Sequence, residues 1–136
     1  MSLHIFTFVR KESMRALLTI VLLLISNSFM TYAWYGHLRD NPDAKKTGFW
    51  VFATTILISW GIALFEYIFM VPANKLGYHG NGGPFSLIQL KIIQEVASII
   101  IFMIFSLTFF KDEAFKWNHA VAFLLILIAV YLVFKK

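Results

Sequence analysis

Three ionisable side chains lie inside long apolar stretches of this chain: Glu66, Lys91 and Glu95. A charge near the centre of a bilayer costs about 2.5 to 3.5 kcal/mol even on insertion scales, so such residues normally face a cavity or a partner. Lys91 and Glu95 are four residues apart, which places them on one face of a helix. These residues are therefore candidates for binding a polar solute or carrying a proton.

Other polar residues recur at helical spacing before Glu66. Thr55 and Ser59 precede it on the same face, and the aromatic residues Trp60 and Tyr67 lie beside that face. The stretch that contains them is thus predicted to be a membrane helix with one polar stripe. Such a stripe requires a polar path or a partner.

We expect this stripe to meet the one formed by Lys91 and Glu95. Counted from the Gly-rich segment between them, Glu66 lies about 8 Å deep and Glu95 about 13 Å deep at the helical rise per residue. Two carboxyl groups would then share one ammonium group, and desolvation favours the neutral form of the surplus carboxyl group, which can carry a proton. Glu95 is the first candidate for that role, and Asn27 is expected to add a polar contact from the first apolar run.

Two other interpretations remain open. Lys91 can pair only with Glu95 one turn away, or extend its ammonium group to the headgroups, and Glu66 can do the same near the end of its helix. Alternatively, these side chains contact another subunit. The sequence does not decide among the three.

Four apolar runs must position these residues. The 136-residue chain is 60% hydrophobic and 14% charged, with a mean hydropathy of +0.75, whereas soluble domains are about 45 to 50% apolar and about 25% charged. A hydrocarbon core about 30 Å thick needs about 20 helical residues, and the runs that fit are 16–34, 49–71, 86–110 and 117–134. The predicted fold class is all-α: a four-helix transmembrane bundle of two helical hairpins, forming a single membrane domain over 1–136 with an N-terminal extension over 1–15.

The ends of these runs carry further signals. Ser86 and Gln89 fit a capping box at the start of the third helix, and Pro72 predicts the end of the second helix. Residues 41–43 form an N-cap pattern before the second helix. The Gly-rich segment 77–84 is predicted to be a flexible turn, because the strand and the Lys-Ser/Thr pair of a phosphate-binding loop are missing.

Charge distribution predicts the orientation in the membrane. Seven of the 12 Lys and Arg residues lie on the side of the two termini and five on the other. The positive-inside rule then predicts a multi-pass membrane protein with both termini cytoplasmic. The small difference leaves dual insertion open. Basic residues before the first run also resemble a signal peptide, but apolar and aromatic residues continue to Tyr35, which favours a retained span.

Four sequence segments carry a resemblance to a known family: FMTYAWYGHL at 29–38, ILISWGIALFEY at 56–67, VPANKLGY at 71–78 and FSLIQLKIIQEV at 85–96. The chain is similar, over nearly all of its length after Met14, to a small four-helix bacterial family of unknown function grouped with the drug/metabolite transporter superfamily. Within the stretch 105–134, which resembles the last hairpin of that superfamily's repeat, Glu113 would match an acid that commonly precedes the final helix. The resemblance implies a location in the cell membrane, the bacterial inner membrane.

The resemblance implies a transporter-like protein, with one departure. Small multidrug exporters of this superfamily act as dimers with a proton-coupling Glu in their first helix. The first run here contains Ser26, Asn27, Ser28 and Thr31 but no carboxylate. Drug/proton exchange through that helix is therefore not implied.

Several function classes are not expected. The net charge of +5 comes from residues between and beside the apolar runs, so nucleic acid is not an expected partner. Cys is absent, and His37, His79 and His119 lack the helical spacing of metal ligands, so no metal and no cofactor is expected. No arrangement of a nucleophile and a base can be placed, and an enzyme is not expected.

We expect instead that the protein moves an unknown small solute, with proton coupling if a carboxyl group is neutral. A cationic solute is one version of this hypothesis, and a homodimer is expected because four short helices barely enclose a path. The alternative is a non-transporting membrane subunit or an assembly factor of a larger complex. The predicted path residues are Glu66, Glu95, Lys91, Asn27, Ser59, Trp60 and Tyr67.

Overall fold

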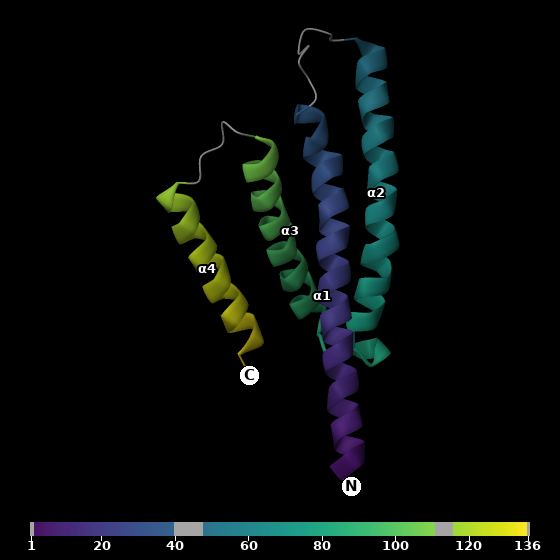
Figure 1. Ribbon diagram of the computed structural model, residues 1–136, viewed down its shortest axis with the longest axis vertical. Helices are drawn as coiled ribbons and strands as arrows, with labels where there is room; N and C mark the ends of the chain where they lie inside the picture. The colour runs from purple at the N-terminus through teal and green to yellow at the C-terminus, as the bar shows by residue number, and fades with distance from the viewer. Residues whose placement is uncertain (1, 40–47, 111–115, 136) are drawn as a thin grey trace.

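The computed structural model describes residues 2–39, 48–110 and 116–135. Their fold consists of long helices: α1 (Ser2–Arg39), α2 (Phe49–Gly77), α3 (Leu87–Phe109) and α4 (Trp117–Phe134), with a short 3₁₀ helix η1 (His79–Asn81) after α2 (Figure 1). By length and composition, each of the four α-helices can cross a membrane. The predicted all-α, four-helix transmembrane fold is thus confirmed, and the protein is a multi-pass membrane protein.

Helix α1 is the centre of the packing. It lies between α2 and α3 and contacts both of them, whereas α4 contacts α3 over only a few residues (Figure 1). The buried apolar side chains come from the first three helices, and no described residue of α4 is buried. Small residues such as Ala33, Ala73 and Ala97 allow close approach of these helices. The described core is therefore a three-helix core with α4 at its side.

Two boundaries differ from the sequence predictions. Helix α1 begins at Ser2, so residues before 16 continue the first helix. Helix α2 does not end at Pro72 but continues to Gly77. Proline removes one backbone hydrogen bond, and packing of the turn beyond it compensates: Ala73 is fully buried, and a Cβ added at Gly77 would lie 2.7 Å from Leu90.

The connection from α2 to α3 is an ordered turn. The amide of His79 donates to the carbonyl of Phe85 at 2.7 Å, and the amide of Phe85 donates to the carbonyl of Gly77 at 2.9 Å. Arg15 of α1 donates to the carbonyls of Asn81 and Gly82. The turn is therefore attached to α1 as well as to its own hairpin.

The capping box predicted for α3 is present. The Ser86 hydroxyl accepts from the amide of Gln89 at 3.2 Å, and the Ser86 amide donates to the Gln89 side chain at 3.0 Å. The predicted signals at 41–43 and at Glu113 lie outside the described residues.

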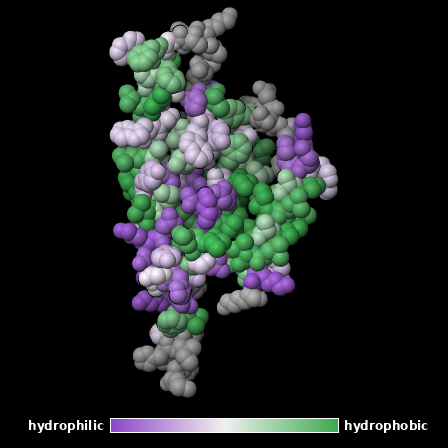
Figure 2. Space-filling model, turned by 180° about the vertical axis from the view of Figure 1, so that it is seen from behind, coloured by the Kyte–Doolittle hydropathy of each residue, from purple (hydrophilic) through white to green (hydrophobic). Residues whose placement is uncertain are grey.

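The outer surface is mostly apolar. Figure 2 shows hydrophobic side chains over much of the molecule seen from behind, with hydrophilic groups near both ends of α4 and in patches on the main body. Large apolar residues such as Trp60 (70% exposed) and Leu125 (61% exposed) face outward. Lipid is the solvent that such a surface fits.

Candidate functional site between α1 and α2

Helix α1 directs polar side chains into the protein. The Thr19 hydroxyl donates to the carbonyl of Arg15, and the Asn27 amide donates to the carbonyl of Leu23, both at 2.8 Å. Each hydrogen bond goes to the carbonyl group four residues earlier, so both side chains have a partner within α1 itself. Ser26 differs, because its hydroxyl reaches another helix. The buried polar residues of α1 are Thr19, Ser26, Asn27 and Thr31, at most 5% exposed.

The residue that Ser26 reaches is Glu66 of α2. The Ser26 Oγ donates to Glu66 Oε1 at 3.3 Å, and Glu66 is 2% exposed. Among the described residues, the second carboxyl oxygen, Oε2, has no hydrogen-bond partner. A buried polar atom without a partner costs about 1 to 3 kcal/mol. Glu66 therefore has unused capacity to accept a hydrogen bond or to hold a proton.

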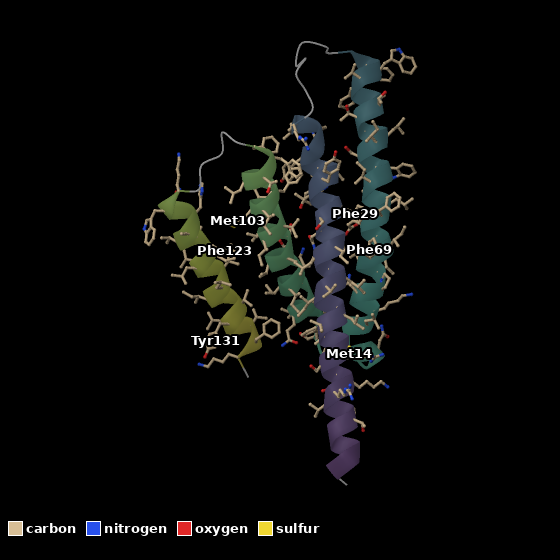
Figure 3. All side chains as sticks on the ribbon, in the orientation of Figure 1. Met14, Phe29, Phe69, Met103, Phe123 and Tyr131 are labelled. Atoms are coloured by element: carbon tan, nitrogen blue, oxygen red, sulfur yellow. The ribbon has the colours of Figure 1, made fainter. Side chains whose placement is uncertain are left out.

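Aromatic side chains join α1 and α2 in the stretch of α2 that carries Glu66. The Phe29 ring of α1 stacks on Phe65 and on Phe69 of α2, with centroid distances of 5.8 Å and 5.6 Å. Figure 3 shows Phe29 and Phe69 between the two helices. Phe65 directly precedes Glu66 and Phe69 follows it by three residues, so this ring stack joins α1 to α2 in the same stretch of α2 that carries Glu66.

An open groove lies toward the other end of the same helix pair. It has a volume of about 960 Å³, and Ser59 and Trp60 are among its lining residues. Its last lining residue on α2 is Ala63, three residues before Glu66, which corresponds to about 4.5 Å along the helix axis. The polar side chains in its otherwise apolar and aromatic wall are His37, Thr55 and Ser59.

The structure divides the predicted path residues between different places. Ser59 and Trp60 line the groove, and Glu66 lies beyond its end. Asn27 is buried on α1, but its amide is used within that helix. Tyr67 is 52% exposed and does not line the groove.

The expected meeting of Glu66 with Lys91 and Glu95 is wrong. Lys91 Nζ lies 2.5 Å from Glu95 Oε1, and the two side chains are 67% and 53% exposed. Helices α2 and α3 meet near their connecting turn, where the Gln94 amide donates to Met70 Sδ at 3.4 Å.

At Glu66 the neighbouring helix is α1, which supplies Ser26 in place of Lys91. The alternative in which Lys91 pairs with Glu95 one turn away is confirmed for these two residues. Its other half, in which Glu66 extends to the headgroups, is wrong because Glu66 is buried. Glu95, the first candidate for a desolvated carboxyl group, is exposed, and Glu66 is the buried one.

Family comparison agrees with this architecture. A family model described as "Putative member of DMT superfamily (DUF486)" matches residues 19–134. The chain belongs to this family. Members of the DMT superfamily are transporters, so the DUF486 chain is a transporter-like membrane protein, as the sequence resemblance implied. No curated protein and no solved structure matches the chain.

Sequence reasoning missed one half of the DUF486 site. From the sequence, Ser26 was named only among the polar residues of a run without a carboxylate, and His37 only as lacking the spacing of a metal ligand. In the structure Ser26 donates to Glu66 and His37 lines the groove. The available signal was the spacing of Thr19, Ser26 and Asn27, which lie on one helical face inside an apolar run.

Proposed function

We propose that this DUF486 protein moves a small solute along the contact between α1 and α2. One observation supports this most: Glu66 is 2% exposed, has an oxygen without a described partner, and lies one helical turn beyond the end of the groove. The groove would admit the solute, and the Glu66 carboxyl group would bind its polar end.

Proton coupling follows from competition for one carboxyl group. If Glu66 binds either a proton or the solute, loading one releases the other. The group facing it from α1 is the Ser26 hydroxyl, which carries no charge, and the charged groups of α3, Lys91 and Glu95, pair with each other. A basic or cationic solute fits this scheme, because an ionised carboxylate accepts hydrogen bonds from a charged donor.

A second subunit would complete the path. The groove is open on its outer side, and α4 contributes no buried described residue. We therefore propose a homodimer in the bacterial inner membrane, with cytoplasmic termini. Another membrane subunit in the same position is the alternative, and it corresponds to a non-transporting role.

Reconstitution into proteoliposomes tests the proposal. Wild-type protein and Glu66→Gln would be compared for flux of a panel of organic cations under an imposed pH gradient. We expect the wild type to carry at least one solute with proton exchange and Glu66→Gln to lose that exchange. Absence of any wild-type flux, together with copurification of a foreign membrane subunit in a fixed ratio, would contradict the proposal and support the non-transporting role.

A further inference from the structure

A second pocket, separate from the groove, lies where α2 ends and α3 begins. It has a volume of about 360 Å³, and its wall includes the side chains of Lys75 from α2 and Lys91 from α3. Two lysine residues from two helices thus line one concave site. No acidic residue is among its lining residues.

The remaining polar wall is suited to an anion. Asn74, Tyr78, Asn81 and Gln94 also line the pocket, and they bring amide and phenol donors. The Gln94 amide donates to Met70 Sδ at 3.4 Å, and an amide group has a second N–H for a ligand. The turn that carries Asn81 is held in place, because the Asn81 amide side chain donates to the Lys75 carbonyl at 3.3 Å and Arg15 donates to the Asn81 carbonyl at 3.2 Å. The donors are therefore presented by an ordered segment.

The ion pair of Lys91 does not block this site. Glu95, its partner, is not among the lining residues, and both side chains are largely exposed. Exposed pairs at this spacing are weak. Lys91 can therefore turn its ammonium group toward a ligand in the pocket.

The location of the pocket indicates which anion it would bind. It lies beside the turn that joins α2 to α3, and the ends of membrane helices are expected to meet the headgroup layer. The sequence assigns this end to the side with seven of the 12 Lys and Arg residues. Basic pockets between membrane helices on the positive side bind anionic headgroups. We propose that the Lys75–Lys91 pocket binds a phosphate group, supplied by an anionic lipid headgroup or by a free phosphate anion.

Lipid binding to the purified full chain tests this proposal without any flux measurement, so its result is separable from that of the proposed function. Native mass spectrometry would measure retention of phosphatidylglycerol, with phosphatidylcholine of the same acyl chains as the reference lipid. We expect phosphatidylglycerol affinity to fall about fivefold in Lys75→Gln and about 25-fold in Lys75→Gln/Lys91→Gln, since each lysine contributes separately. Lys75→Arg should retain binding.

Lys135→Gln is the matched control, because Lys135 follows α4 on the same side and outside the pocket. It should change affinity less than twofold. Equal losses in Lys135→Gln and Lys75→Gln, or unchanged binding of both phosphatidylglycerol and inorganic phosphate in the double variant, would overturn the proposal. Added inorganic phosphate distinguishes the sources: lysine-dependent displacement of the lipid identifies a site open to free phosphate, and lysine-dependent lipid binding that phosphate does not displace identifies a headgroup site. Lysine-dependent binding of phosphate alone identifies the free anion as the ligand.

Discussion

The two hairpins of this protein are similar in hydropathy but differ in whether their charged residues are buried or exposed. The α1–α2 hairpin buries Glu66 against Ser26, whereas α3 carries Lys91 and Glu95 as an exposed pair. The first arrangement requires a neighbouring helix, and the second is complete within one helix. Glu66 is therefore the buried carboxyl group that can serve a path between helices, and the Lys91–Glu95 pair is not part of that path.

The largest expected effect concerns packing. Leu23→Ala removes a fully buried side chain of α1 and should lower the free energy of unfolding in detergent by about 2 to 5 kcal/mol. Leu125→Ala, on the exposed surface of α4, is the matched control and should change it by no more than about 0.5 kcal/mol. Equal losses would mean that α4 is as well packed as α1.

The next effect concerns the buried hydrogen bond. Ser26→Ala leaves the Glu66 carboxyl group without its described donor and should cost about 1 to 3 kcal/mol of unfolding free energy. Ser28→Ala serves as the comparison, because the Ser28 hydroxyl is exposed and bonds within α1 to the Leu24 carbonyl. Thermal unfolding in detergent measures both variants. A Ser26→Ala protein as stable as Ser28→Ala would show that the bond to Glu66 is not used.

The smallest effect belongs to the exposed ion pair. Replacing both partners, Lys91→Gln with Glu95→Gln, should change the free energy of unfolding by about 0 to 1 kcal/mol, because exposed pairs contribute little. The same unfolding assay reports it. A loss as large as that of Leu23→Ala would place this pair in the core with Glu66.

Hydropathy was sufficient to predict the helices but not which helices pack against each other. The run 117–134 and helix α4 coincide, and the Ser86 cap starts α3 as expected, because both depend on local chemistry. The helix end predicted at Pro72 was wrong, because the packing of Ala73 and Gly77 outweighs the loss of one backbone hydrogen bond. The helix propensity of single residues does not include such packing between helices.

The same limit explains the site. Glu66 and Glu95 were expected to meet because they lie at comparable depths along their helices. Depth does not show that α1 is the main neighbour of α2. The partner of Glu66 is Ser26, 40 residues earlier in the chain. Only the arrangement of the helices in space identifies that pair.

The central claim is that Glu66, and not the Lys91–Glu95 pair, carries the function. The most direct test compares Glu66→Gln with Glu95→Gln in proteoliposomes at matched protein content, for proton-coupled solute flux. Gln keeps the shape of Glu and removes its titratable charge. We predict that Glu66→Gln abolishes the coupled flux and that Glu95→Gln retains most of it. Full coupled flux in Glu66→Gln, or its loss in Glu95→Gln alone, would contradict this account.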